Sequence, residues 1–218
     1  MRLIPTALAI TVCCLASSCE TADSARSGTA QQPPPSTFVH SFTKFSFPES
    51  VGSFHRLKVQ KYDPQGRDIG VGYDSSTPIA LTVFVYPGPK DFALLPSPKL
   101  GDVSEGLLDG HFQTCKKDII RHHSDARLIT EGACEIVQGG NRFKGRKAVY
   151  SLNYTFGPLA KPQLSLSELY VFLVEPGLKF LATDRNFNKY RITYPETKKV
   201  QTETEVSEFM NNLLWPVK

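Results

Sequence analysis

Alternating apolar and polar residues predict strands in the first part of the chain. The alternation is clear in Phe42–Phe47 and strongest in Ile79–Tyr86, a run of β-branched and aromatic residues. Between them, Phe54–Tyr62 and Asp68–Tyr73 are joined by the turn residues Asp63-Pro64-Gln65-Gly66. These segments together predict an antiparallel meander.

The spacing of apolar residues becomes helical after residue 104. The recurring positions are Leu108, Phe112, Cys115 and Ile119. They predict a helix that begins with Ser104 as its cap and runs to about His123. A second segment of this kind, Glu203–Leu214, predicts an amphipathic helix near the C-terminus.

Strand-like segments return between these two helices. They are Arg127–Thr130, Cys134–Gln138, Phe143–Phe156, Leu166–Val174 and Leu178–Thr183, with hairpin turns expected at Gly139-Gly140-Asn141 and Pro176-Gly177. The order of elements predicts an α+β fold: an antiparallel sheet of two meanders with a central helix and a C-terminal helix packed on it.

The N-terminus has the features of an export signal. Arg2 precedes an apolar run, Leu3–Leu15, that is shorter than the roughly 20 residues needed to span a bilayer. The exit Leu15-Ala16-Ser17-Ser18-Cys19 resembles the bacterial lipobox. This resemblance implies cleavage before Cys19 and a mature N-terminal cysteine that carries diacylglycerol and palmitate. An ordinary signal peptide, cleaved after Ser18 to give a secreted protein, remains the alternative.

A linker follows the expected lipidation site. Residues 20–37 are rich in Ser, Thr, Ala, Gln and Pro and hold no apolar cluster, which is typical of a flexible spacer. The expected organisation is a lipoprotein signal peptide at 1–18, a lipidated cysteine and linker at 19–37, and a single α+β domain at 38–218. Glu20 after the cysteine resembles enterobacterial lipoproteins, which implies an outer-membrane location facing the periplasm.

Charge narrows the range of partners. The formal net charge of the chain is +4, and removal of residues 1–18 takes away Arg2 and no acidic residue, which leaves +3. Such a mild charge on an exported protein argues against nucleic acid as a partner. The expected partners are the membrane, through the lipid anchor, and an envelope protein or anionic ligand.

The element order also resembles a known fold. A meander, a long helix, a second meander and a C-terminal helix are similar to the PsbP-like fold of several small bacterial lipoproteins and exported proteins. The segments Asp68–Pro87 and Gly145-Arg146-Lys147-Ala148 resemble uncharacterised proteobacterial lipoproteins. The resemblance implies an assembly factor or binding subunit and assigns no functional residue.

One stripe of the central helix carries potential metal ligands. His111, Cys115, Asp118 and His122 are spaced i, i+4, i+7 and i+11, and their donor atoms suit zinc or copper. The competing interpretation places Cys115 in the core and pairs it with Cys134, because two cysteines in one periplasmic domain are expected to form a disulfide. The two interpretations exclude each other, and we predict the disulfide and no cofactor.

A basic run suggests an anion-binding patch. Asn141–Lys147 is rich in Arg and Lys, and Lys116, Lys117 and Arg121 on the predicted helix could join it. The alternative is a hairpin whose basic residues alternate outward into solvent.

The leading functional hypothesis is a membrane-anchored envelope lipoprotein that acts as a noncatalytic binding or assembly module. The alternative is a periplasmic hydrolase or transferase of undescribed type. A pocket that brings His55, His111 or His122 beside a carboxylate would favour the enzyme.

Overall fold

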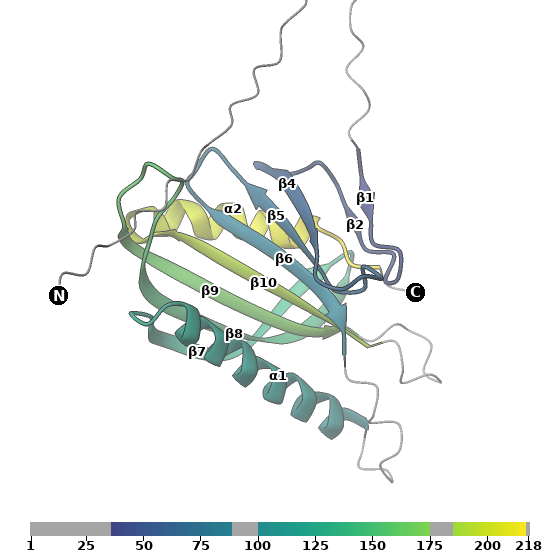
Figure 1. Cartoon of the computed structure of the whole chain (residues 1–218). Helices are drawn as coiled ribbons and strands as arrows, with labels where there is room; N and C mark the ends of the chain where they lie inside the picture. The colour runs from purple at the N-terminus through teal and green to yellow at the C-terminus, as the bar shows by residue number, and fades with distance from the viewer. Residues whose placement is uncertain (1–35, 89–99, 175–184, 217–218) are drawn as a thin grey trace, which may run out of the picture. The chain divides into compact units, whose positions relative to one another are not determined.

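The computed structural model describes residues 36–88, 100–174 and 185–216 (Figure 1). In the helix that begins at residue 100, it describes the side chains from residue 104 onward. Two short strands, β1 (Phe38–Val39) and β2 (Ser46–Phe47), pair as a small separate sheet. The remaining elements are β3 (Ser50–Val51), β4 (Phe54–Lys61), β5 (Ile69–Asp74), β6 (Ala80–Pro87), α1 (Leu100–His122), β7 (Arg127–Gln138), β8 (Asn141–Tyr154), β9 (Gln163–Val174), β10 (Asn186–Pro195), a 3-10 turn (Glu196–Lys198) and α2 (Lys199–Asn212).

The main sheet joins both predicted meanders through one strand. Within the described residues it has eight strands in the order β3-β4-β5-β6-β10-β9-β8-β7, and each recorded strand pairing is antiparallel. The strand β10 lies between β6 and β9, so it connects the two meanders into one continuous sheet. The predicted α+β class is confirmed.

The two helices cover opposite faces of this sheet. Alternate residues of β9 divide between two apolar cores: Leu169 and Val171 pack with α1, whereas Tyr170 and Phe172 pack with the core that includes α2. Successive side chains of a strand point to opposite faces, so this division places α1 on one face of the sheet and α2 on the other. The helix α1 lies over β8 and β9, as Figure 1 shows.

The core on the α2 side is rich in aromatic residues. Phe209 of α2 lies edge-on to Phe54 and Tyr73, with ring centroids 4.9 and 5.0 Å apart. Beyond the helix, the indole Nε1 of Trp215 donates to the Tyr190 hydroxyl at 2.7 Å. The buried Gln138 amide donates to the Leu213 carbonyl at 3.0 Å, which satisfies a carbonyl that the end of the helix leaves without a partner.

Several predicted boundaries are confirmed. Gly139 and Gly140 form the β7–β8 turn with positive φ angles of 54° and 81°, which glycine adopts without strain. Gly66 in the β4–β5 turn has a φ of 68°. The expected turn at Pro176-Gly177 and the expected strand 178–183 lie outside the described residues.

Other predictions need correction. Residues 42–47 do not form one strand, because a turn occupies 41–43 and only Ser46–Phe47 pairs. The helix α1 begins at Leu100, so Ser104 lies inside it and is not its cap. The two strands predicted at 127–130 and 134–138 are one twelve-residue strand, β7, with an irregularity between Leu128 and Thr130.

Candidate functional site

A groove of about 830 Å³ lies between the N-terminal half of α1 and the β7–β8 hairpin. It is lined by Ser104, Glu105, Leu108, Ala133, Cys134, Glu135, Arg142, Phe143, Lys144, Gly145, Arg146, Leu173 and Val174. Leu108 and Leu173 belong to the apolar core beneath α1, so the inner wall of the groove is hydrophobic. Its size and lining are typical of ligand and peptide sites.

Ion pairs neutralise most charges around this groove. Arg142 bonds Glu135 at 2.6 Å, and Arg146 on the β8 strand bonds Asp109 of α1 at 2.6 Å. The second pair ties the hairpin to the helix across the groove. The rim therefore offers directional polar contacts and little net charge.

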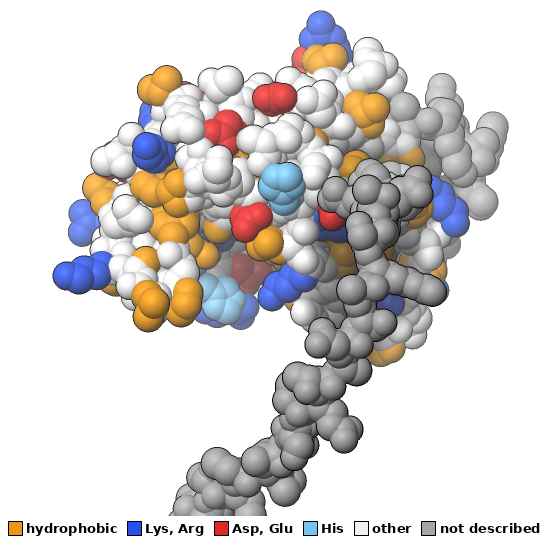
Figure 2. Space-filling view, turned by 90° about the horizontal axis from the view of Figure 1, so that it is seen from above, with side chains coloured by type: hydrophobic (Ala, Val, Ile, Leu, Met, Phe, Trp, Pro, Cys, Tyr) orange, Lys and Arg blue, Asp and Glu red, His pale blue; other side chains and the backbone are white. Residues whose placement is uncertain are grey.

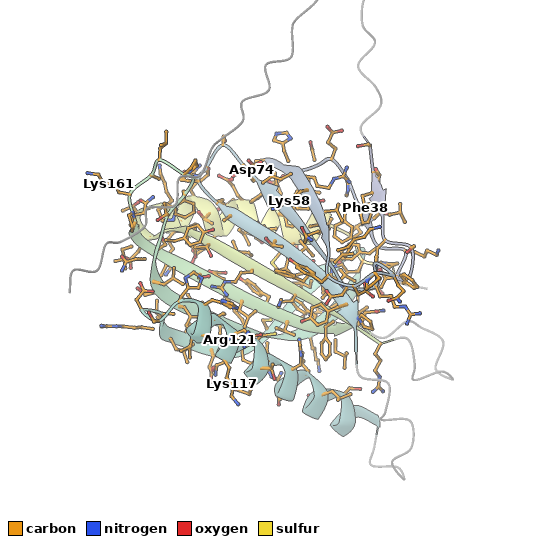
Figure 3. All side chains as sticks on the ribbon, in the orientation of Figure 1. Phe38, Lys58, Asp74, Lys117, Arg121 and Lys161 are labelled. Atoms are coloured by element: carbon orange, nitrogen blue, oxygen red, sulfur yellow. The ribbon has the colours of Figure 1, made fainter. Side chains whose placement is uncertain are left out.

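Most cations of the suggested anion-binding patch form ion pairs. Lys147 reaches the other face of the sheet and pairs with Glu168 at 3.0 Å. On α1, Lys116 pairs with Glu131 and Arg121 with Asp118. Figure 3 labels Lys117 and Arg121 on α1, and both are exposed. Three residues of the basic run, Arg142, Lys144 and Arg146, line the groove, and an anionic partner stays a prediction.

A polar cluster lies under α1, next to the apolar core. The Nε2 atom of His111 is 3.3 Å from the Cys115 Sγ and also bonds the Tyr86 hydroxyl. The imidazole stacks on Phe187 with ring centroids 4.1 Å apart. One helical turn separates His111 from Cys115, so the helix itself brings their side chains together.

Burial keeps this cluster neutral. Desolvation lowers the pKa of His111 to about 4, and the Lys189 ammonium nearby adds to the effect. Desolvation also raises the pKa of the Cys115 thiol and of the Tyr86 hydroxyl. Near neutral pH the pair is therefore thiol and imidazole, whereas a nucleophilic cysteine requires the thiolate.

The metal interpretation is not supported by the described residues. No group of three or more His, Cys, Asp or Glu side chains converges there. Of the four predicted ligands, only His111 and Cys115 meet. Asp118 bonds Arg121 at 3.1 Å, and His122 is exposed.

The predicted disulfide between Cys115 and Cys134 is wrong in this structure. Both thiols are free. Cys115, which is 4% exposed, packs beneath α1, whereas Cys134 packs against the core on the other face. The backbone of the sheet separates them, so the two sulfur atoms cannot approach to bonding distance. Burial raises the pKa of the Cys134 thiol to about 11.

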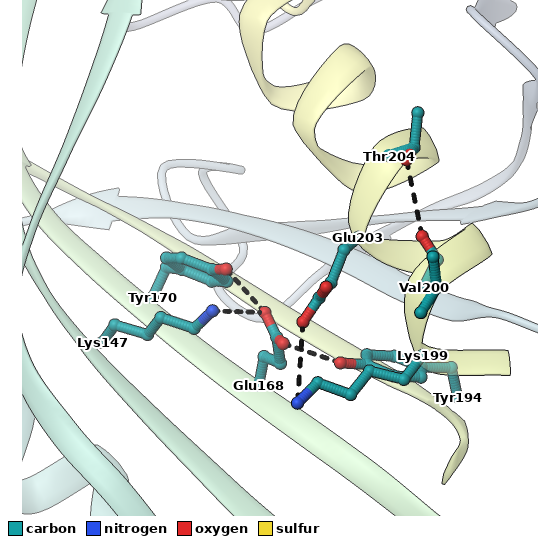
Figure 4. Close-up of polar contacts among 8 residues, drawn as sticks. All are labelled: Lys147, Glu168, Tyr170, Tyr194, Lys199, Val200, Glu203 and Thr204. Atoms are coloured by element: carbon teal, nitrogen blue, oxygen red, sulfur yellow. Dashed lines mark hydrogen bonds and ion pairs between the residues drawn. The ribbon is translucent and has the colours of Figure 1, made fainter. Parts of the chain in front are cut away.

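A buried carboxylate on the α2 side was not identified from the sequence. Glu168 is 4% exposed and accepts hydrogen bonds from the hydroxyls of Tyr170, at 2.5 Å, and Tyr194, at 2.7 Å, besides its ion pair with Lys147 (Figure 4). Every partner lies on the sheet. The buried carboxylate therefore links β8, β9 and β10 through its two hydrogen bonds and its ion pair. Its only signal in the sequence was a charge inside the apolar run Leu166–Val174.

The histidines of the enzyme hypothesis do not converge. His55 on β4 is exposed and bonds Ser50 at 2.9 Å, His111 lies under α1, and neither is a lining residue of the groove. The expected lipidation site Cys19 lies outside the described residues. Among the helices that the structure describes, none is both long enough and apolar enough to cross a membrane.

Comparisons with known proteins give a likeness of fold. No family model matches the chain, and no curated protein matches it. Among solved structures, it is similar to the solution structure of cyanobacterial PsbP (CyanoP) from Synechocystis sp. PCC 6803, with 14% identity and a TM-score of 0.35. The match covers 84% of this chain and 96% of that one. The neighbour is a PsbP protein, and at this identity the likeness says nothing of what the chain does.

Proposed function

We propose that the protein is a lipid-anchored envelope lipoprotein whose α+β domain is a noncatalytic binding module. Acylated Cys19 and the linker up to residue 37 hold the domain at the outer membrane, facing the periplasm. The groove between α1 and the β7–β8 hairpin binds a segment of an envelope protein. The proposal for the anchor rests on the lipobox-like sequence, and the proposal for binding rests on the groove.

The groove is the observation that carries the binding role. It combines an apolar inner wall with a rim of ion pairs, an arrangement that favours an apolar segment with polar flanks. The Arg146–Asp109 pair links β8 to α1 at the rim of the groove.

The chemistry of the nearby side chains agrees with binding without catalysis. The thiol of Cys115 and the imidazole of His111 are held in their neutral forms by burial. The Glu168 carboxylate is buried on the α2 side of the sheet, where it contacts Tyr170, Tyr194 and Lys147. We therefore assign the groove no reactive group.

The anchor is tested by intact mass. The protein is purified from bacterial membranes beside a Cys19→Ala variant. We expect the wild-type chain to begin at Cys19 with added acyl mass and the variant to leave the membrane fraction. A wild-type chain without acyl mass would show that the protein is secreted and not anchored.

The groove is tested separately by photo-crosslinking in cells. A benzoylphenylalanine replaces Ala133, an exposed residue of the groove wall. A second substitution, Glu105→Trp, partly fills the groove from an exposed position of α1, and Gln113→Trp adds the same side chain to α1 outside the groove. We expect an adduct of one discrete mass that Glu105→Trp weakens and Gln113→Trp leaves unchanged. The binding role would be refuted if no adduct forms, or if neither substitution changes the yield of the adduct.

A further inference from the structure

The strand pairings bring several segments together at one end of the main sheet. Ser151, near the end of β8, pairs with Arg127 at the start of β7 and with Leu166 near the start of β9. Leu166 also pairs with Tyr194 near the end of β10, and α2 follows β10 closely. The β8–β9 loop (residues 155–162), the start of β7 and the start of α2 therefore share this end of the sheet, which we call the β8–β9 end.

Large apolar side chains are exposed at the β8–β9 end. In the loop, the Ala160 amide donates to the Gly157 carbonyl at 3.4 Å, and the turn that this bond closes carries Leu159, which is 98% exposed. Val200 in the first turn of α2 is 80% exposed. The other exposed apolar residues of this end are Leu128, Ile129 and Leu164, together with Leu57, which lines a groove with Phe156 of the loop.

The surface of this end is apolar with cations around it. In the view from above, hydrophobic side chains gather on the side of the domain where Figure 3 labels Lys161, and Lys and Arg side chains surround them (Figure 2). Lys161 of the loop is exposed and forms no ion pair within the described part of the chain. Exposed apolar patches of this kind mark surfaces that bind a partner or a membrane.

The linker joins the domain at the same end. The Arg56 guanidinium donates to the Ser36 carbonyl at 2.9 Å, which places the first described residue beside the start of β4. Arg56 pairs with Tyr73 near the end of β5. Tyr73 pairs in turn with Leu81 of β6, which pairs with Ile192 near the end of β10. Ser36 therefore lies at the end of the sheet that carries the exposed loop.

The length of the linker keeps an anchored domain close to its membrane. A flexible chain from Cys19 to Ser36 spans about 23 Å on average. The folded domain itself has a radius of gyration of about 16 Å. The lipid and the domain are therefore separated by little more than the size of the domain, and the end that receives the linker is the one held nearest the bilayer.

We propose that the β8–β9 end docks on the surface of the bilayer that holds the lipid anchor. Leu159 and Val200 enter the boundary between headgroups and acyl chains, and the Lys161 ammonium stays among the headgroup phosphates. This inference rests on the anchor of the proposed function. In this orientation the groove between α1 and the β7–β8 hairpin faces away from the membrane, because Arg142 and Val174 in its lining lie at the opposite ends of β8 and β9.

Docking is tested by tryptophan fluorescence of the acylated full chain in vesicles of phosphatidylethanolamine and phosphatidylglycerol, with and without brominated acyl chains. Leu159→Trp reports on the tip of the loop. Phe42→Trp is the matched control, because Phe42 is 49% exposed and the neighbouring His40 donates to the Gly66 carbonyl at the far end of β4. Trp215 is buried and adds the same background to both variants.

We expect brominated lipids to remove about half or more of the emission that Leu159→Trp adds and to leave that of Phe42→Trp unchanged. A second reporter, Leu164→Trp, should also be quenched and should lose this quenching when Leu159→Asp is added. Both positions are exposed, so folding of the variants should be unaffected.

Equal quenching of Leu159→Trp and Phe42→Trp, or quenching of neither, would overturn the docking. An emission of Leu159→Trp that shifts to shorter wavelength without quenching would overturn it as well and assign the surface to a second copy of the chain. Intact mass of the same sample reports on the anchor separately. If acyl mass is absent, the anchor fails, and the same fluorescence measurement at millimolar lipid concentration decides the docking by itself.

Discussion

The surroundings of His111 favour its neutral imidazole over the protonated form. Its ring stacks on Phe187 and its Nε2 lies beside the Cys115 thiol and the Tyr86 hydroxyl, while the Lys189 ammonium is near enough to oppose protonation. These surroundings lower its pKa from 6.5 to about 4. The shift connects the protonation of one side chain to the stability of the fold.

We predict that this residue makes the fold less stable in acid. Between pH 6.5 and about 4, the unfolded chain has a protonated His111 and the folded chain does not, so the unfolded state binds more protons. The free energy of unfolding should therefore fall as the pH falls through this window. Urea unfolding of the wild type and of His111→Gln, measured at several pH values from 4 to 7, gives the two slopes.

The variant separates His111 from the other histidines. His40 and His123 also have lowered pKa values, but they are present in both proteins. We expect a shallower dependence on pH in His111→Gln. Equal slopes would mean that His111 is already accessible to protons in the folded state.

The two cysteines show which parts of the site could be predicted from the sequence. Helical spacing correctly placed Cys115 in the core and His111 beside it, because four residues make about one turn. The partner of Cys115 was mispredicted, because the face on which Cys134 lies depends on strand register. A register shift of one residue would exchange the two faces, and the local sequence does not show which of the two helices each face of β7 meets.

Among the elements, β8 shows how closely neighbouring strands approach. At Gly145 a Cβ atom would lie against the ring of Phe172 on β9 and 2.6 Å from the carbonyl oxygen of Val171. The ring thus occupies the place of the missing side chain. Phe172 in turn packs edge-on to Trp215, with centroids 5.0 Å apart.

We predict that Gly145→Ala destabilises the domain by about 1–3 kcal/mol through overpacking. The matched control is Gly132→Ala on β7, where a Cβ would meet nothing within 4 Å. That variant should be neutral or slightly stabilising, because alanine restricts the unfolded chain more than glycine. Denaturant unfolding measures both. Similar effects of the two substitutions would show that the Phe172 ring moves aside at little cost.

Most elements could be predicted from the periodicity of apolar residues, but β10 could not. Its Tyr190, Ile192 and Tyr194 alternate with Lys189 and Arg191, which is a strand signal, but polar side chains at its first positions interrupt the apolar pattern. Its place between β6 and β9 depends on pairings with residues about 20 and 100 positions away. Local sequence does not encode such distant pairing.

For the molecule as a whole, the order of strands predicts where the fold opens first. Within the described residues, β10 is paired along both edges, whereas β7 at the end of the sheet is paired with β8 alone and is mostly exposed. Local opening costs less where fewer buried contacts are broken.

Hydrogen exchange followed by mass spectrometry tests this expectation. Peptides from β10 should exchange slowest and those from β7 much faster. The β8–β9 region should be intermediate, because α1 covers it. Exchange of β7 as slow as that of β10 would indicate that its outer edge is paired with another chain in solution.

The sheet that keeps Cys115 and Cys134 apart also divides the interior into two compartments. Side chains beneath α1 meet few of those beneath α2, since a layer of backbone lies between them. Changes in separate compartments act independently, so their energetic effects add. Evolution can therefore change the aromatic packing around Trp215 without disturbing the Cys115 thiol and the His111 imidazole on the other side. Each face of the protein is thus free to acquire its own binding partner.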